Sequence, residues 1–332
     1  MATIQSQKFI HYDNIDVAKV IFAIFVVAIH TLSPFTATLS NEAQRVITAL
    51  LSMAVPFFFV ASGFLLGNKL NSTDKEKQLV YLRKWLYRIG RLYLLWTFIY
   101  LPYAIYGFSI EKLGFIKSIA IYIRNIVLLG ENYWSWPLWY LLAMLVAGCI
   151  IYLLLHIKIK RGYWYIIAVI LAFSGILIEN FTPTIGGGNA YYSIFKTTRN
   201  GFFIGFPYMA LGLLISSCRC RPSKTKLFVL LIIGFVAQLF KIPLSDFVTI
   251  YALFVLILDL NLPTRKYDLY INMRLSSSVI YFTHMLWVGV LLLLYPKLPP
   301  IPLFVTAVIL SGLTAIIFIR HKEKKIVQLL FH

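Results

Sequence analysis

The first apolar segment carries three ionisable residues at spacings that could serve acyl transfer. The segment reads DVAKVIFAIFVVAIH from Asp16 to His30, and Lys19 lies eleven positions before His30. On an α-helix, Lys19 and His30 therefore share one face, about 16 Å apart along the axis. Asp16 lies one turn before Lys19 and can pair with it. Because a charged group inside a bilayer costs about 2.5–3.5 kcal/mol, these residues are candidates for function.

Transfer of an acyl group from a coenzyme A thioester would use such a face. Lys19 could pair with the nucleotide phosphates, and the apolar face beyond it could hold the pantetheine arm. His30 could take the proton from an acceptor hydroxyl, because imidazole titrates near neutral pH. The alternative is a lysine that extends to the interface and a histidine that hydrogen-bonds within the bundle. Spacing alone leaves these two interpretations equally open.

Other polar residues in apolar segments allow more than one interpretation. Arg88 and Arg91, in WLYRIGRLYLLW, are neighbours on one helix face and suit phosphate recognition, although basic flanking of a span is the simpler explanation. His284, in SSSVIYFTHMLW, could line the same cavity as His30 or have a packing role. We interpret Ser62, in VASGFLL, as one of the small residues that allow close helix packing and not as a nucleophile.

The composition places these residues in a membrane protein. Sixty per cent of the 332 residues are hydrophobic and 13% are charged, whereas soluble domains have about 25% charged residues. The net charge of +19 comes from short basic clusters between apolar runs, which indicates membrane orientation and not nucleic-acid binding. The three cysteines supply neither a disulfide framework nor a four-ligand metal site, so we predict no metal.

We expect an all-α polytopic bundle that forms a single domain over residues 1–332. A span needs roughly 20 mainly apolar residues. The stretch 115–129 carries two basic residues, and we interpret it as an amphipathic interfacial helix. The ten predicted spans lie near 14–33, 46–67, 87–107, 138–156, 163–179, 202–216, 226–241, 246–261, 275–295 and 299–319.

Ten spans place both termini on the same side of the membrane. The segments predicted on that side contain 22 Lys and Arg residues, and those on the opposite side contain 8. The richer side is cytoplasmic by the positive-inside rule. We therefore expect the amino and carboxyl termini to be inside.

Aromatic residues gather near the predicted outer ends of the spans. Trp139 and Tyr140 follow Tyr133, Trp134 and Trp136 within a few positions. An interfacial aromatic belt is the commoner explanation. The alternative is a platform on which sugar rings stack.

Six short elements occur in order along the chain. They are Asp16, Lys19 and His30; Pro56, Phe58, Phe59, Ser62 and Gly63; Arg88 and Arg91; Leu138, Trp139, Tyr140 and Leu141; Arg199, Asn200, Gly205, Pro207 and Gly212; and Ile280, Tyr281 and His284. Together they resemble the acyltransferase-3 family of integral membrane acyltransferases over almost the whole chain. Lys19 stands where that family more often has arginine. The resemblance implies ten core helices, an acyl-CoA donor and a carbohydrate-type acceptor.

The sequence therefore predicts a multi-pass enzyme of the bacterial cytoplasmic membrane. It would move an acyl group, expected to be acetyl, from cytoplasmic acyl-CoA to a hydroxyl of a carbohydrate or glycolipid. We expect acyl-CoA as a co-substrate, no permanently bound cofactor, and no nucleic-acid partner. The predicted site has His30 as general base, Lys19, Arg88 and Arg91 on the donor, Asp16, His284 and Tyr281 in support, and Trp139, Tyr140, Glu179 and Arg199 toward the acceptor.

Two other classes of protein compete with this prediction. A transporter or exporter of a glycan or small polar solute would carry its substrate along the same polar path without chemistry. Such proteins usually show inverted repeats with interrupted helices, and no internal symmetry is evident here. A bis-histidine haem protein is a weaker alternative, because no two histidines recur at matching depths on one helix.

Overall fold

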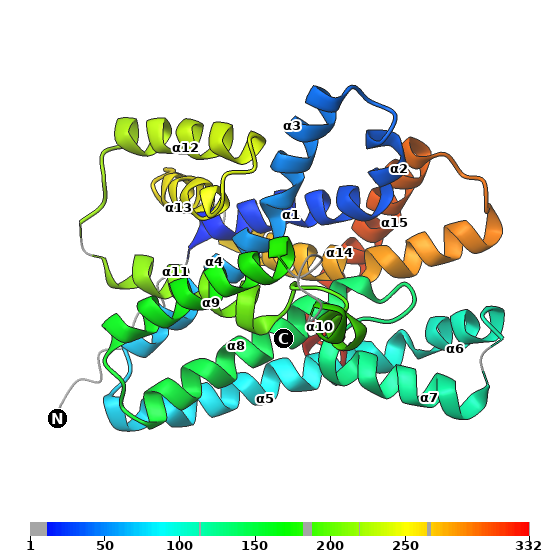
Figure 1. Ribbon diagram of the computed structural model, residues 1–332, viewed down its shortest axis with the longest axis horizontal. Coiled ribbons are helices and arrows are strands. Elements are labelled where there is room, and N and C mark those ends of the chain that lie inside the picture. Colours follow the sequence, from blue (N-terminus) through cyan, green and yellow to red (C-terminus); the bar gives the residue numbers. More distant parts are fainter. Residues whose placement is uncertain (1–11, 113, 182–187, 219, 264–266, 332) are drawn as a thin grey trace.

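The structure is a computed structural model that describes residues 12–112, 114–181, 188–218, 220–263 and 267–331. Every regular element in these ranges is a helix (Figure 1), as predicted. Short turns of tighter or wider helix lie at Asn125–Leu129, Trp136–Leu138 and Gly201–Gly205. The α-helices are α1 (Asp13–Thr31), α2 (Ser33–Thr36), α3 (Asn41–Ser52), α4 (Ala54–Asn71), α5 (Lys75–Ile99), α6 (Leu101–Ile110), α7 (Phe115–Arg124), α8 (Trp139–His156), α9 (Arg161–Phe181), α10 (Gly188–Phe195), α11 (Phe206–Ser217), α12 (Lys224–Leu239), α13 (Ser245–Leu258), α14 (Tyr267–Leu294), α15 (Pro300–Arg320) and α16 (Lys325–Phe331).

Within the described residues, six helices are long and apolar enough to cross a membrane. They are Asp13–Thr31, Asn41–Asn71, Trp136–His156, Arg161–Asn180, Asp268–Leu294 and Pro300–Arg320. The other four predicted spans also fall on helices, but three of these, α11, α12 and α13, are shorter than 18 residues. Length and composition therefore support six spans, or seven if the bent pair α5 and α6 counts as one.

The bend between α5 and α6 corrects the prediction of one continuous span over 87–107. The two helices meet at an angle of 47°. Pro102 lies in the first turn of α6, where its ring fixes φ and its missing N–H removes a helical hydrogen bond. The stretch 115–129 is also helical, but α7 has only ten residues and none of them is buried. It is too short to be an eleventh span.

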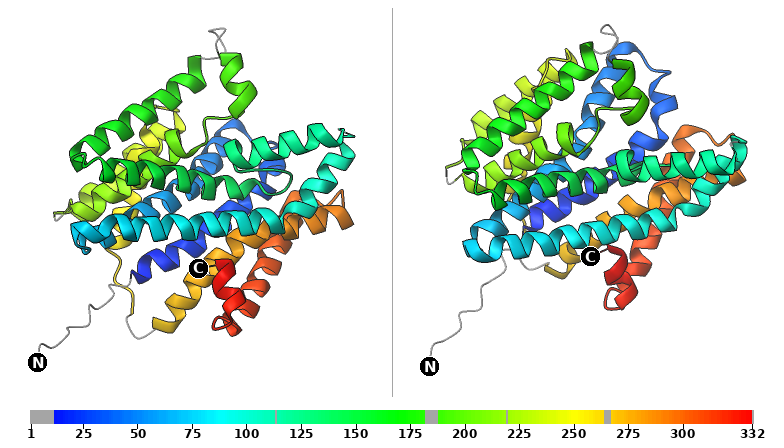
Figure 2. Two further views of the ribbon diagram at one scale, coloured as in Figure 1. Left: turned by 90° about the horizontal axis from the view of Figure 1, so that it is seen from below. Right: turned by 60° about the horizontal axis from the view of Figure 1, so that its bottom comes forward.

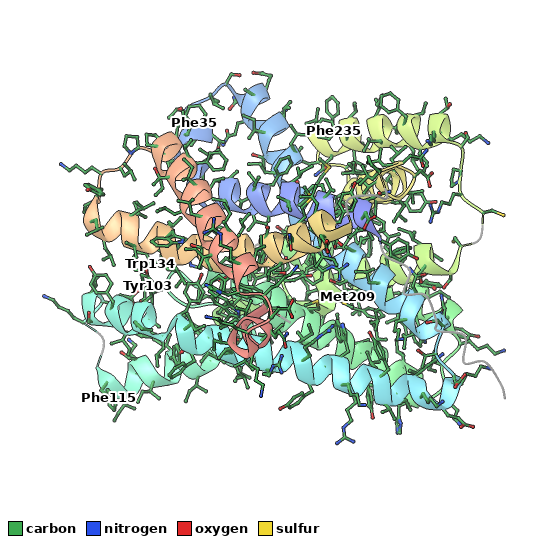
Figure 3. The ribbon with its side chains drawn as sticks, turned by 180° about the vertical axis from the view of Figure 1, so that it is seen from behind. Phe35, Tyr103, Phe115, Trp134, Met209 and Phe235 are labelled. Atoms are coloured by element: carbon green, nitrogen blue, oxygen red, sulfur yellow. The ribbon has the colours of Figure 1, made fainter. Side chains whose placement is uncertain are left out.

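Apolar side chains cover much of the outer surface of this bundle. Only 22% of the apolar window of α9 and of α15 is buried inside the protein. Figure 3 shows Phe115 at the edge of the molecule, where it is 79% exposed, whereas Met209 lies in the interior. Such a surface needs lipid in place of water. The chain is a multi-pass helical membrane protein.

Helices α4 and α11 touch through their backbones. A Cβ atom added to Gly63 would lie 2.1 Å from the carbonyl oxygen of Met209, and one added to Gly212 would lie 2.2 Å from that of Val60. The small residues around Ser62 thus allow close packing, as interpreted from the sequence. Ser62 itself shares a hydrogen bond of 3.0 Å with the hydroxyl of Tyr140.

Helix α1 runs beside α14 in the same direction, and it also packs against α4 and α15 (Figures 1 and 2). The α4–α5, α8–α9 and α11–α12 connections lie together at one end of the bundle, the left end in Figure 1. The α6–α7 and α14–α15 connections lie at the other end. Lys75, the first residue of α5, lies at this end, as does Lys160 of the α8–α9 connection. Basic segments that are far apart in sequence therefore share one end of the fold.

Candidate functional site

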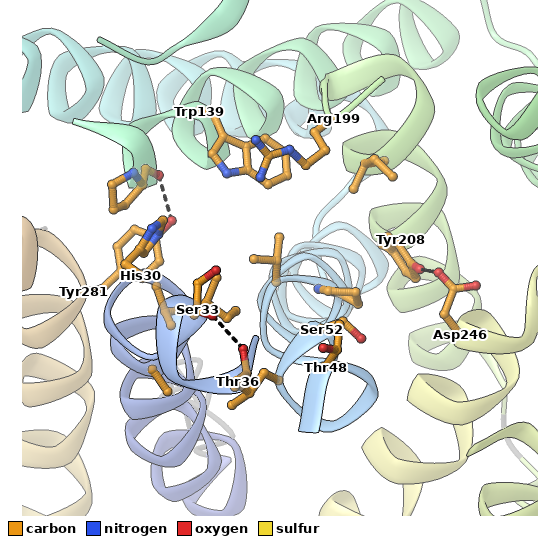
Figure 4. A pocket seen from close by; sticks show the side chains of 18 residues that line it. His30, Ser33, Thr36, Thr48, Ser52, Trp139, Arg199, Tyr208, Asp246 and Tyr281 are labelled. Atoms are coloured by element: carbon orange, nitrogen blue, oxygen red, sulfur yellow. Dashed lines mark hydrogen bonds between the residues drawn. The ribbon is translucent and has the colours of Figure 1, made fainter. Parts of the chain in front are cut away.

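A cavity of about 420 Å³ opens between α1, α3, α11 and α13 near the carboxyl end of α1 (Figure 4). This volume lies in the usual range of small-molecule sites, roughly 300–1,000 Å³. Its walls combine apolar residues such as Val26 and Val55 with a smaller polar set. The polar and aromatic residues labelled in Figure 4 are His30, Ser33, Thr36, Thr48, Ser52, Trp139, Arg199, Tyr208, Asp246 and Tyr281.

His30 lies in the wall of this cavity, in the last turn of α1. Its ring centroid is 5.9 Å from that of Trp136 and 5.5 Å from that of His284, with interplanar angles of 24° and 30°. The side chain is half-buried, so it reaches the cavity while its ring is held between neighbours. The predicted base therefore faces a space that can hold an acceptor.

His284 lies behind His30 and is fully buried on α14. Its Nδ1 lies 2.8 Å from the carbonyl oxygen of Tyr281 and 3.1 Å from that of Ile280. The hydroxyl of Tyr281 donates to the carbonyl oxygen of Pro137 at 2.8 Å, which ties α14 to the turn that carries Trp136. Of these predicted supporting residues, Tyr281 lines the cavity and His284 contacts the ring of His30.

The other end of the α1–α14 pair holds an ion cluster. Lys19 Nζ lies 3.8 Å from Asp16 Oδ1, so the predicted pair forms. Arg274 is the closer partner of Asp16, with Nη2 at 2.8 Å from Oδ2 and Nε at 3.1 Å from Oδ1. Asp16 is 2% exposed, and a carboxylate buried this deeply needs such charge-assisted bonds. The sequence did not single out Arg274, because it counted only as one of the basic residues that flank spans.

Arg88 and Arg91 lie on α5, which packs against α8 and the carboxyl-terminal helix α16. Arg88 is exposed and Arg91 is half-buried. Lys19, by contrast, lies on α1 among α14, α4 and α15. Joint contact of these three cations with one donor phosphate group stays a prediction.

The residues predicted toward the acceptor separate into three positions. Trp139 and Arg199 both line the cavity, and the guanidinium of Arg199 lies over the Trp139 ring at 5.7 Å. Tyr140 is buried instead, and its hydroxyl donates to the carbonyl oxygen of Phe58 at 3.2 Å. Glu179 lines a neighbouring cavity of about 360 Å³ and accepts a hydrogen bond from Thr198 at 3.2 Å.

Six polar or aromatic residues of the cavity were not predicted from the sequence, namely Ser33, Thr36, Thr48, Ser52, Tyr208 and Asp246. The hydroxyl of Tyr208 donates to Asp246 Oδ2, and Asp246 lines both cavities. The sequence did hold a signal for Asp246, because it is an acidic residue in the first turn of α13, which begins at Ser245 and is otherwise mainly apolar. Tyr208 is held by its stack on Phe247, with centroids 4.1 Å apart. The cavity thus contains a positioned carboxylate opposite the basic residues His30 and Arg199.

The fold and this site define a helical membrane protein with a polar cavity between its spans. The family model described as "Acyltransferase domain" matches residues 12–329. The chain belongs to this acyltransferase family, as its resemblance indicated.

Among curated proteins, the chain is similar to a protein named "Serine/alanine racemase" of Enterococcus gallinarum. The two are 30% identical over 253 residues, which are 70% of this chain and 34% of that protein. A protein named "Amino-acid racemase" of Enterococcus faecalis is 27% identical over 266 residues, 78% of this chain and 33% of that protein. The matched part thus spans about a third of the length of these relatives. No solved structure matches the chain.

Proposed function

We propose that the protein transfers an acyl group, preferably acetyl, from cytoplasmic acyl-CoA to a hydroxyl of a carbohydrate or glycolipid. The observation that carries this proposal is His30, a half-buried imidazole in the wall of a cavity, on the same helix as the ion pair of Asp16 and Lys19. The racemase names of the relatives belong to proteins more than twice as long as this chain, and the family and the site support the proposed activity.

The proposed reaction needs one proton acceptor at the site of attack. His30 takes the proton from the acceptor hydroxyl while the hydroxyl oxygen attacks the thioester carbonyl. The carbon–sulfur bond then breaks, and the coenzyme A thiolate leaves. The imidazolium of His30 returns the proton to this thiolate or to water, and the new ester leaves with the acceptor.

The lining of the cavity supports a carbohydrate as the acceptor. Ser33, Thr36, Thr48 and Ser52 contribute hydroxyl groups to it. The Trp139 face and the Asp246 carboxylate supply the stacking and acceptor groups that sugar rings and sugar hydroxyls use. The adjoining cavity shares Asp246 and Ile204 with the first cavity, so the two together offer more room than the first cavity alone.

We propose ten spans with both termini cytoplasmic, in the cytoplasmic membrane of a bacterium. In this arrangement the end of the bundle with the α4–α5 and α8–α9 connections faces the cytoplasm. The cavity at the carboxyl end of α1 then lies toward the outer leaflet. The donor would reach it from the cluster at Lys19 along α1.

Single-cysteine labelling tests this orientation. In a background with Cys149, Cys218 and Cys220 replaced by serine, K75C, K160C and K224C are expected to react with a membrane-impermeant maleimide only after permeabilisation. A37C and K297C are expected to react in intact cells. All five positions are exposed, so a difference in labelling reports the side of the membrane. Labelling of K160C from outside would reverse the orientation.

Donor affinity tests the proposed phosphate contacts. Lys19→Gln and Arg88→Gln are each expected to weaken acyl-CoA binding by about 1.5–3 kcal/mol, the scale of a hydrogen bond to a charged group. Lys19→Arg keeps the charge and is expected to bind normally. A pantetheine thioester lacks the nucleotide, so its affinity should change little. Calorimetry in detergent gives both affinities, and equal losses for the two donors would show that Lys19 acts through Asp16 and not on the nucleotide.

The alternative function, transport, predicts a different product from the proposed enzyme. A transporter would move a glycan or polar solute and form no acylated product from acyl-CoA. Mass spectrometry of membrane glycans with and without the protein separates the two functions. A mass change by one acyl group that depends on the protein supports the enzyme, and its absence together with solute movement supports transport.

A further inference from the structure

We propose that His284 accepts a hydrogen bond from His30 and stabilises the imidazolium that forms when His30 takes the proton of the acceptor. His284 would therefore be a positioning residue of the catalytic site and not a packing residue. This inference rests on the proposed function of His30 as the base.

The hydrogen bonds of His284 determine which of its nitrogens carries the proton. A carbonyl oxygen can only accept, so Nδ1, which faces the Tyr281 and Ile280 carbonyls at 2.8 and 3.1 Å, must be the N–H donor. In the neutral ring, Nε2 is then an acceptor with a free lone pair. Among the described residues Nε2 has no hydrogen-bond partner, although it is fully buried. A buried acceptor without a partner is costly unless it has a function.

The distance to His30 suits an N–H···N hydrogen bond. Two imidazoles joined in line by a bond of about 2.9 Å have ring centroids about 5 Å apart. The observed separation is 5.5 Å, with the ring planes inclined by 30°. The proposed bond needs a rotation of the half-buried His30 ring that points one of its nitrogens at Nε2 of His284. The other nitrogen of His30 remains available to the cavity.

The groups around this pair leave His284 as the acceptor within reach. From α14, Tyr281 donates its hydroxyl to Pro137. Across the cavity, Arg199 is a cation that cannot accept, and Asp246 lies beside Tyr208 on the far wall (Figure 4). Asp16 binds Arg274 at the other end of α1. A neutral imidazole thus occupies the place that a carboxylate holds in a Ser-His-Asp triad.

The proton balance follows from this arrangement. The acceptor proton goes to the cavity-facing nitrogen of His30, and the opposite N–H of His30 stays on His30 while it donates to His284 Nε2. When the coenzyme A thiolate leaves, the proton returns from the cavity-facing nitrogen. His284 stays neutral throughout and exchanges no proton with the substrates.

Two variants of matched size test the inference by kinetics. His284→Leu removes the acceptor, and turnover is expected to fall roughly 10–100-fold with the KM for acyl-CoA unchanged, the scale of one bond to a charged group. His284→Gln keeps an acceptor oxygen and should recover most of the turnover. In a His30→Ala background, His284→Leu should cause no further loss. Normal turnover of His284→Leu, or equal losses for the leucine and glutamine variants, would overturn the inference.

A spectroscopic measurement on the unmodified protein tests it without any acceptor. The chain has six histidines, and ¹⁵N labelling of histidine in detergent-solubilised protein reports the protonation of each ring nitrogen. The signals absent from His284→Gln belong to His284. We expect a protonated Nδ1 and an unprotonated Nε2 at neutral pH. A protonated Nε2 would overturn the inference even if acyl transfer is confirmed, whereas inactive wild-type protein with the expected tautomer would count against the proposed function alone.

Discussion

Replacement of His30 by alanine is expected to lower acyl-transfer turnover by roughly 10²–10⁴-fold, the range that a general base contributes. Donor affinity should stay nearly normal, because the proposed phosphate contacts are Lys19 at the other end of α1 and Arg88 and Arg91 on α5. The half-buried ring of His30 only packs beside Trp136 and His284, so folding should be largely retained.

The measurement is single-turnover transfer in detergent or liposomes, with acyl-CoA binding and the unfolding temperature recorded for the same samples. His156→Ala is a suitable control, since His156 lies in the last turn of α8 and does not line the cavity. It should transfer normally. A His30→Ala protein that transfers acyl groups at a near-normal rate would remove His30 from the mechanism.

A methyl group added between α4 and α11 is expected to destabilise the whole fold. In Gly63→Ala the new Cβ would lie 2.1 Å from the Met209 carbonyl oxygen, and in Gly212→Ala 2.2 Å from that of Val60. These contacts are with backbone atoms, so the helices themselves must separate. Overpacking of a core usually lowers the free energy of unfolding by about 1–3 kcal/mol. Because the new methyl groups meet backbone atoms, the loss in these variants is expected at or above the upper end of that range.

The same two helices carry residues of the cavity, so the loss should extend to function. Pro56 on α4 and Tyr208 on α11 both line it. Gly90→Ala and Gly312→Ala are matched controls: the nearest atom to the new Cβ is 3.8 Å away in the first, and none lies within 4 Å in the second. These controls should be neutral or stabilised by up to about 1 kcal/mol. Thermal unfolding in detergent compares the four variants, and a stable, active Gly63→Ala would contradict the close packing.

Local spacing was sufficient to predict which residues of the first helix share a face. Asp16, Lys19 and His30 lie on one face because their separations match the helical period, whatever surrounds the helix. The structure confirms that both ends of this face meet α14, through Arg274 and His284. The partners themselves could not be predicted. Asp16 and Arg274 are 258 positions apart, and only the packing of α1 on α14 brings them together.

Rotation around a helix explains why Trp139 and Tyr140 take different positions. Trp139 and Tyr140 are neighbours in sequence and were expected together, but successive residues of an α-helix point about 100° apart. Trp139 therefore faces the cavity, and Tyr140 packs between Phe58 and Ser62. Which of the two would face inward depended on the neighbours of α8, and the sequence of α8 alone does not contain that information.

Composition and hydrophobic pattern thus determined the class of protein, the helical architecture and the residues of α1 that could do chemistry. Each of these depends on local properties, namely hydropathy, segment length and helical period. The tertiary structure decided the cavity, the pairing of His30 with His284, the place of Arg274 beside Asp16, and the entry of Asp246 and Tyr208 into the site. These four features depend on the register between helices. Packing between side chains that are far apart in the sequence sets this register, so no single segment encodes it.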